Sequence, residues 1–196
     1  MSPLERLKRM VEESIRLKDQ FFGEQGEKVL ATARLLVEVF QAGGKVLIFG
    51  NGGSAADAQH LAAEFVNRFQ VERPPLAALA LTTDTSILTA VANDYDFKQV
   101  FAKQVRALGR PGDLAWGIST SGNSPNVVAG LDTARELSMK TLALSGGDGG
   151  PVAAAAEMAL TVPSRNTPRV QEVHITIGHV LCDLVDFLLF PEKFEG

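Results

Sequence analysis

The chain has 196 residues, of which 45% are hydrophobic and 21% are charged, and its formal net charge at pH 7 is −4. A chain of this length and composition suits one packed globular domain and excludes a disordered or collagen-like protein. The acidic balance disfavours partners that are bound through bulk positive charge, so we expect no nucleic acid and no membrane surface among them.

Cysteine usage and the distribution of apolar residues predict the compartment. Cys182 is the single cysteine, which excludes an intrachain disulfide framework and fits a reducing environment. The first residues, MSPLERLKRMVEES, carry charges every few positions and lack the continuous apolar stretch of a secretory signal. No segment approaches the roughly 20 apolar residues that span a bilayer. We therefore expect a cytoplasmic protein.

Two helical patterns come first in the chain. Apolar residues recur at helical spacing over residues 4–22 and again over residues 27–42, where Gly43 and Gly44 end the pattern. Two helices are therefore predicted before any strand. They would cover one face of a sheet or pack on another subunit.

Short apolar runs of the kind that form buried strands follow, at residues 45–50, 76–81, 113–118, 140–144 and 158–162. Helical patterns lie between and after them, over residues 54–68, 84–92, 97–108, 124–137 and 168–189, with a short alanine-rich turn at 152–157. Strands that alternate with helices are typical of a parallel sheet covered on both faces. The sequence thus predicts an α/β fold: a three-layer sandwich around a five-stranded parallel sheet, in a single domain over residues 1–196.

Two polar stretches, GNGGSA and STSGNS, come directly after the first and third predicted strands. In a doubly wound sheet, ligands bind outside the carboxyl ends of the strands. Glycines let the backbone approach a ligand, hydroxyls donate hydrogen bonds, and a helix N-terminus attracts an anion. One such stretch alone is more often a turn with a helix cap, but two at equivalent places favour capture of a phosphate monoester. The second stretch offers four hydroxyls: Ser119, Thr120, Ser121 and Ser124.

A histidine and a glutamate lie just downstream of the first polar stretch. His60 and Glu64 are four residues apart, so a helix that begins at Ser54 places them on one face. Such a pair can bind a metal or transfer a proton, and it also occurs as an ordinary exposed helix pair. The spacing by itself leaves all three interpretations open.

Two further polar residues, Gln171 and His179, lie eight positions apart in the last predicted helix. That is about 12 Å along the helix axis, so one helix can hardly aim both at one small ligand. If both serve the same kind of site, they come from different chains. We therefore expect active sites built across subunit interfaces.

Four segments in order along the chain resemble one known family: GNGGSAADAQHLAAEF, ALTTDTSILTAVANDY, ISTSGNSPNVV and RVQEVHITIGHVLCDLVD. Together they resemble bacterial phosphoheptose isomerases, which carry a sugar-isomerase (SIS) domain with a flavodoxin-like fold. The resemblance implies conversion of D-sedoheptulose 7-phosphate to D-glycero-D-manno-heptose 7-phosphate, the first step towards nucleotide-activated heptose for lipopolysaccharide or surface glycans. It also implies a cytoplasmic homotetramer with active sites between subunits, in which residues 1–44 form a helical extension packed in the oligomer.

The resemblance also implies roles for individual residues. Glu64 resembles the base that moves a proton between two carbons, and His179 resembles its acid–base partner. The phosphate cradle would comprise Ser54, Ser119, Ser121 and Ser124, with Thr120 beside it. The other substrate-binding residues would be Asn51, Gly52, Gly53, Asn93, Asp94 and Gln171. In many family members one zinc ion per subunit, which a given preparation can lack, is bound at the positions of His60, Glu64, Gln171 and His179.

Two other functions stay open at this point. The chain also resembles a replication-initiator-associating protein, a non-enzymatic tetrameric adaptor, in NRFQVERPPLAALAL, AKQVRALG and CDLVDFLLFP. That adaptor has residues unable to do proton work at the positions of Glu64 and His179, so their presence here favours the enzyme. A sugar-phosphate sensor would keep the serine loops without needing the four proposed metal ligands. One departure from the family, Pro168 where some relatives have aspartate, affects the predicted substrate selectivity more than the reaction type.

Overall fold

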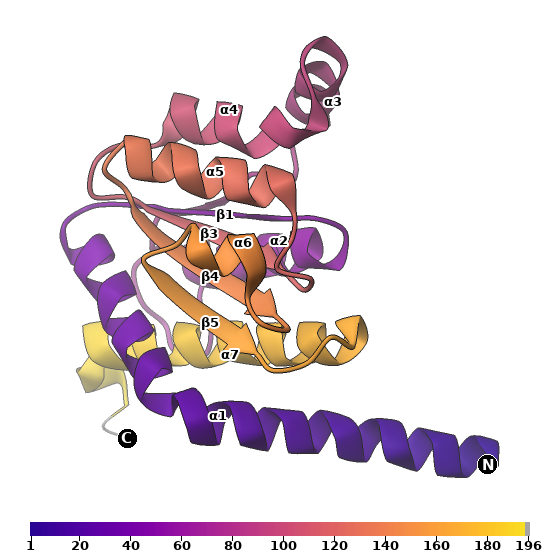
Figure 1. Ribbon diagram of the computed structural model, residues 1–196. Helices are drawn as coiled ribbons and strands as arrows, with labels where there is room; N and C mark the ends of the chain where they lie inside the picture. Colours follow the sequence, from indigo (N-terminus) through magenta and orange to yellow (C-terminus); the bar gives the residue numbers. More distant parts are fainter. Residues whose placement is uncertain (195–196) are drawn as a thin grey trace.

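The strands form where the sequence has short apolar runs, and they make one parallel sheet (Figure 1). The computed structural model describes residues 1–194. Its strands are β1 Val46–Gly50, β2 Ala78–Ala80, β3 Leu114–Ser119, β4 Lys140–Gly146 and β5 Met158–Val162. Their order in the sheet is β2-β1-β3-β4-β5, and all neighbours pair in parallel. This is the flavodoxin-like order, so the predicted fold class is confirmed.

Helices cover both faces of the sheet, as predicted (Figure 1). The helices are α1 Pro3–Gln41, α2 Gly53–Val66, α3 Thr85–Asp94, α4 Val100–Leu108, α5 Pro125–Glu136, α6 Gly150–Ala154 and α7 Thr167–Leu189. Two short 3₁₀ turns, η1 Phe97–Gln99 and η2 Pro191–Lys193, complete the described elements. No helix within residues 1–194 is long and apolar enough to cross a membrane.

Alternation of side chains along β1 separates two hydrophobic cores. In β1, Val46 and Ile48 pack into the layer of α1, α2 and α7, whereas Leu47 and Phe49 pack into the layer of α4, α5 and α6. All four side chains are fully buried. Successive side chains of a strand point to opposite faces, so a continuous apolar run is what a strand buried on both sides requires.

The two predicted N-terminal helices are one continuous helix, α1, so the prediction of two was wrong. Gly23 and Gly26 lie near its middle, and each glycine costs a helix about 1 kcal/mol relative to alanine. Tertiary packing outweighs this cost, because Phe21 and Val29 on either side are buried in the core. Figure 1 shows that α1 changes direction near its middle, as helices often do at glycine.

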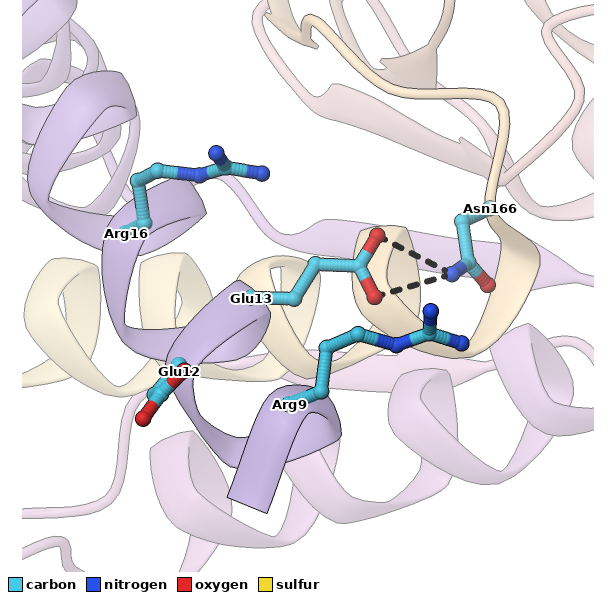
Figure 2. A pocket seen from close by; sticks show the side chains of 5 residues that line it. All are labelled: Arg9, Glu12, Glu13, Arg16 and Asn166. Carbon is cyan, nitrogen blue, oxygen red and sulfur yellow. Dashed lines mark hydrogen bonds between the residues drawn. The ribbon is translucent and has the colours of Figure 1, made fainter. Parts of the chain in front are cut away.

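The first half of α1 extends away from the sheet and contacts the start of α7 (Figures 1 and 2). The Nδ2 atom of Asn166 lies 3.3 and 3.5 Å from the two carboxylate oxygens of Glu13, and Arg169 donates a hydrogen bond to the carbonyl of Met10. A charged cavity of about 600 Å³ lies here, lined by Arg9, Glu12, Glu13, Arg16 and Asn166. It contains none of the predicted site residues.

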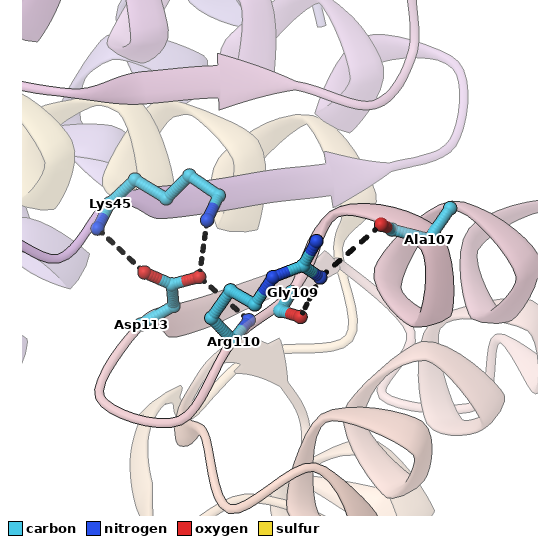
Figure 3. A network of polar contacts seen from close by, with 5 residues as sticks. All are labelled: Lys45, Ala107, Gly109, Arg110 and Asp113. Carbon is cyan, nitrogen blue, oxygen red and sulfur yellow. Dashed lines mark hydrogen bonds and ion pairs between the residues drawn. The ribbon is translucent and has the colours of Figure 1, made fainter.

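Asp113 joins the amino ends of the neighbouring strands β1 and β3 (Figure 3). The two polar loops follow the carboxyl ends of the same strands. The carboxylate of Asp113, which is almost completely buried, accepts hydrogen bonds from the backbone N–H of Lys45 at 2.9 Å and of Arg110 at 2.8 Å, and it pairs with the ammonium group of Lys45. We expect Asp113→Asn to lower the free energy of unfolding by about 1–3 kcal/mol, because the amide cannot accept all these bonds. Urea unfolding of the two proteins measures the difference, and equal midpoints would contradict it.

Candidate active site

Three serine hydroxyls converge at the carboxyl end of β3. The Oγ atom of Ser119 lies 2.8 Å from that of Ser124 and 3.4 Å from that of Ser121. Gly122 has φ +69°, a left-handed conformation that favours glycine and turns the chain back towards α5. Ser124 precedes α5 and makes no side-chain bond to the helix, so its hydroxyl stays oriented towards Ser119. We call residues 119–124 the serine loop; hydroxyls gathered at a helix N-terminus suit an anion.

The loop after β1 lies beside the serine loop. The side-chain amides of Asn51 and Asn126 exchange two hydrogen bonds, of 2.9 and 2.8 Å, which join this loop to the first turn of α5 where the strand order reverses. Gly52 has φ +55° and precedes α2 without a side-chain cap. Ser54 is buried in the first turn of α2, against Gly50. The structure thus brings the predicted residues of both polar stretches to the same switch point of the sheet.

A cavity of about 460 Å³ opens beside the serine loop. Thr120, Ser121 and Asn123 line one side of it. The other side comes from the loop after β4, the first turn of α6 and the segment that leads into α7, with Gly147, Asp148, Gly150, Pro151, Arg165 and Thr167. None of these six is among the substrate-binding residues that the resemblance implied. The sequence does contain a signal for this part of the cavity. The stretch SGGDGG lies at the end of the fourth strand, just as the two serine- and glycine-containing stretches lie at the ends of β1 and β3.

His60, Glu64 and His179 lie together where α2 and α7 pack. The Nε2 atom of His60 is 2.8 Å from Nε2 of His179 and 3.4 Å from Oε1 of Glu64. Burial and the neighbouring His60 lower the pKa of His179, and Glu64 acts in the opposite direction. A lowered pKa keeps an imidazole neutral near pH 7, where one ring nitrogen accepts a proton and the other donates one. The pair assigned to proton transfer therefore meets in one place, around His60.

Gln171 lies against a different part of α2 from His179. A side chain at Gly53 would collide with the amide of Gln171, and one at Gly178, next to His179, would collide with Leu61. The two helices therefore run side by side in the same direction, with Gln171 near the start of α2 and His179 further along. Within one chain, these two predicted ligands contact different turns of the neighbouring helix.

Asn93 and Asp94 lie at the end of α3 and are exposed. The Nδ2 atom of Asn93 donates a 2.8 Å hydrogen bond to Asp94. Neither residue is among those that line the cavity beside the serine loop. Within a single chain, these two predicted sugar contacts therefore lie outside the cavity beside the serine loop.

Asp57 is a buried carboxyl in the first turns of α2 that was not predicted as a site residue. Burial raises its pKa from the ordinary value of 3.8 to about 6, although a hydrogen bond with Gln171 and the nearby His60 act in the opposite direction. Its Oδ2 atom has no hydrogen-bond partner within residues 1–194. The folded protein therefore favours the neutral carboxyl.

We expect the wild type to lose stability relative to Asp57→Asn as the pH rises from about 4 to 6. Because the pKa of Asp57 is raised on folding, the folded state binds the proton of this carboxyl more tightly than the unfolded state does. The stabilisation that this proton gives is complete below the pKa of the unfolded state, and it is lost as the pH rises through the pKa of the folded state. Urea unfolding at a series of pH values measures the gap between the two proteins. A gap that stays constant over this range would show that Asp57 titrates normally.

The chain is similar to known proteins in both sequence and fold. Residues 10–146 match the family model of the SIS domain. A phosphoheptose isomerase from Desulfovibrio desulfuricans is 59% identical over 175 residues, which cover 89% of this chain and 83% of that protein. The chain belongs to the phosphoheptose isomerase family of SIS-domain proteins.

Two solved structures of phosphoheptose isomerases have the same fold. The structure from Neisseria gonorrhoeae is 48% identical and superposes with a TM-score of 0.89, covering 94% of this chain and 99% of that chain. The structure from Francisella tularensis is 41% identical with a TM-score of 0.91, covering 95% and 99%. The similarity in fold therefore extends over nearly the whole chain.

The resemblance to phosphoheptose isomerases implies zinc, and the donor types around His60 fit that metal. Two imidazoles and a carboxylate are typical zinc ligands. Their positions fit less well, because two nitrogens bound to one tetrahedral zinc lie about 3.3 Å apart, whereas those of His60 and His179 are 2.8 Å apart. Within residues 1–194, no three histidine, cysteine or carboxylate side chains are arranged to hold an ion. A metal would thus need small side-chain rotations and a further ligand.

Proposed function

We propose that this member of the phosphoheptose isomerase family converts D-sedoheptulose 7-phosphate to D-glycero-D-manno-heptose 7-phosphate. The observation that carries the proposal is the meeting of Glu64 and His179 around His60. It occurs in a chain that is 59% identical to a protein named phosphoheptose isomerase. A carboxylate beside an imidazole suits an isomerisation in which protons move between neighbouring carbons and oxygens.

The serine loop would hold the phosphate group of the substrate. The hydroxyls of Ser119, Ser121 and Ser124 donate hydrogen bonds to its oxygens, and the N-terminus of α5 adds favourable electrostatics. Binding at the phosphate leaves the other end of the sugar free to reach the acid–base pair. Because phosphate binding and proton transfer are assigned to different residues, substitutions in the serine loop should affect mainly KM, and substitutions of Glu64 or His179 should affect mainly kcat.

Glu64 and His179 would then move the protons. Glu64 removes a proton from C1, next to the C2 carbonyl, and the electron pair of the C–H bond forms the enediolate with negative charge on O2. His179 protonates O2 and takes the proton of the O1 hydroxyl, so that the C1 carbonyl forms. Glu64 returns its proton to C2. The enzyme and the atom count are unchanged after the cycle, as acid–base catalysis requires.

Zinc, one ion per subunit, would be held by His60, Glu64, His179 and a Gln171. When bound, a divalent ion polarises carbonyl and hydroxyl oxygens. Gln171 of the same chain contacts the first turn of α2 at Gly53, whereas the other three ligands meet further along that helix. We therefore propose that the glutamine comes from another copy of the chain.

The proposed assembly is a homotetramer with active sites between subunits. Ser54, at the start of α2, and Glu64 are separated by ten residues, or about 15 Å along the helix, which is further than one sugar phosphate extends. A phosphate on one chain would thus be served by the acid–base pair of another. The first half of α1, within the proposed extension of residues 1–44, exposes an apolar row that such packing would cover: Leu4, Leu7, Val11 and Ile15.

The expected setting is the cytoplasm, in the synthesis of nucleotide-activated heptose for lipopolysaccharide or surface glycans. The partners in this proposal are the sugar phosphate and further copies of the chain, with no nucleic acid and no membrane. The adaptor and the sensor are not favoured, because curated relatives 50–59% identical to the chain are named phosphoheptose isomerase.

The decisive experiment incubates sedoheptulose 7-phosphate with the purified protein and follows the aldose product by NMR, with added zinc and with a chelator. We expect product in the presence of zinc. The response to the chelator tells whether turnover needs a metal. If the sugar phosphate binds but no product forms under any metal condition, the adaptor or sensor function replaces the enzyme.

A further inference from the structure

Arg73, in the segment between α2 and β2, has a completely buried side chain. Its guanidinium group donates hydrogen bonds to the backbone carbonyls of Glu64 at 2.9 Å and Phe65 at 2.7 Å. The carbonyls of the last helical turn have no partner inside the helix and carry partial negative charge. A cation at this position therefore satisfies and fixes the end of α2.

The same guanidinium group also binds the neighbouring helix. Its Nε atom donates a 2.8 Å hydrogen bond to Oδ1 of Asp186 on α7, and both side chains of this ion pair are buried. The other oxygen of Asp186 has no hydrogen-bond partner within residues 1–194. Asp186 thus contributes to the fold mainly as the anchor of Arg73.

The two helices joined in this way carry the proposed acid–base pair. Glu64, whose carbonyl Arg73 contacts, belongs to the last turn of α2. Asp186 lies seven residues after His179, so both are on the same face of α7. The guanidinium group of Arg73 therefore contacts the backbone of Glu64 directly, and it contacts α7, which carries His179, through Asp186.

We propose that Arg73 is a positioning residue that fixes Glu64 opposite His179 by joining the end of α2 to α7 at Asp186. We call Arg73, Asp186 and the carbonyls of Glu64 and Phe65 the arginine clamp. The inference rests on the proposed function for its kinetic consequence. The guanidinium fork is essential, because only a planar group with several fixed donors reaches two carbonyls and a carboxylate together.

The main test is the double variant Arg73→Met/Asp186→Leu. Replacing both members of a buried ion pair with apolar residues leaves no unpaired charge and is often neutral for stability. If Arg73 and Asp186 only stabilise the fold, a double variant that folds should therefore have normal kcat and KM. The clamp predicts that kcat for sedoheptulose 7-phosphate falls about tenfold or more while KM changes less than about threefold, because small displacements of catalytic groups are costly.

A second variant covers the case in which the double variant does not fold. Arg73→Lys keeps the charge for Asp186 but loses the fork, so we expect the same selective loss of kcat. Asp113→Asn is the matched control, since it weakens another buried carboxylate network, beside β1 and β3, that shares no residue with the clamp (Figure 3). It should lose stability and keep kcat.

A spectroscopic measurement tests the geometry without turnover. The chain has three histidines, so imidazole NMR signals are few. We expect the signals of His60 and His179 to shift in either clamp variant, while those of His174, which is buried against the carbonyl of Ser145, stay in place. Asp113→Asn should leave all three unchanged.

The outcomes separate the two proposals. If the wild type turns over the sugar phosphate and a folded clamp variant matches it in kcat, KM and histidine signals, the clamp is refuted and the function stands. If the wild type shows no turnover, the proposed function fails, and the signals of His60 and His179 alone decide whether Arg73 positions them.

Discussion

Glu64→Gln should lower kcat for sedoheptulose 7-phosphate by about 10²- to 10⁴-fold, the range that a positioned general base contributes. The amide has nearly the same shape as the carboxylate but cannot take a proton from carbon. Glu64 is only partly exposed and lies beside His60, so the isosteric change preserves the packing of α2. Steady-state kinetics with NMR detection of the aldose measures the loss.

Binding must survive for this result to identify the base. Because the phosphate is assigned to the serine loop on β3, the variant should still bind the sugar phosphate, as calorimetry or ligand-observed NMR can show. Glu136→Gln is the control: this exposed glutamate on α5 pairs with Arg106 and should keep full activity. Normal turnover in Glu64→Gln would refute the assignment of the base.

Gly122→Ala should raise KM for the sugar phosphate about 100-fold, because it distorts the serine loop and misplaces groups that must contact the phosphate. Gly122 has φ +69°, where a residue with a Cβ atom is strained by about 1–2 kcal/mol. The added carbon would also lie 2.5 Å from the carbonyl oxygen of Gly149, a backbone atom that cannot rotate away. The loop that carries Ser121 and Asn123 must therefore shift.

Gly43→Ala separates this local effect from general strain. Gly43 also has a left-handed conformation, with φ +75°, but nothing lies within 4 Å of its missing side chain. It follows α1, far along the chain from the serine loop. We expect it to lose stability and to keep KM. If both variants raise KM equally, the serine loop is not the phosphate site.

The strands and the two serine- and glycine-containing loops could be predicted because their signals are local. Apolar runs such as residues 45–50 are typical of strands that a parallel sheet buries on both faces. A polar stretch after such a run falls at the carboxyl end of the strand. The gathering of Ser119, Ser121 and Ser124 follows from a short loop with a glycine. The number of N-terminal helices was mispredicted because the apolar helical spacing is interrupted between residues 22 and 27, whereas the joint burial of Phe21 and Val29 in one core is not a local signal.

The sequence by itself determined which elements form and which residue types stand at their ends, since helix and strand periodicity and turn chemistry act over a few residues. Only the tertiary structure decided which distant residues meet. His60 lies beside His179, 119 positions away, and Arg73 beside Asp186, 113 positions away. These contacts depend on α2 and α7 packing side by side on one face of the sheet. No local pattern contains that arrangement, because it is set by strand order and by the burial of whole helix faces.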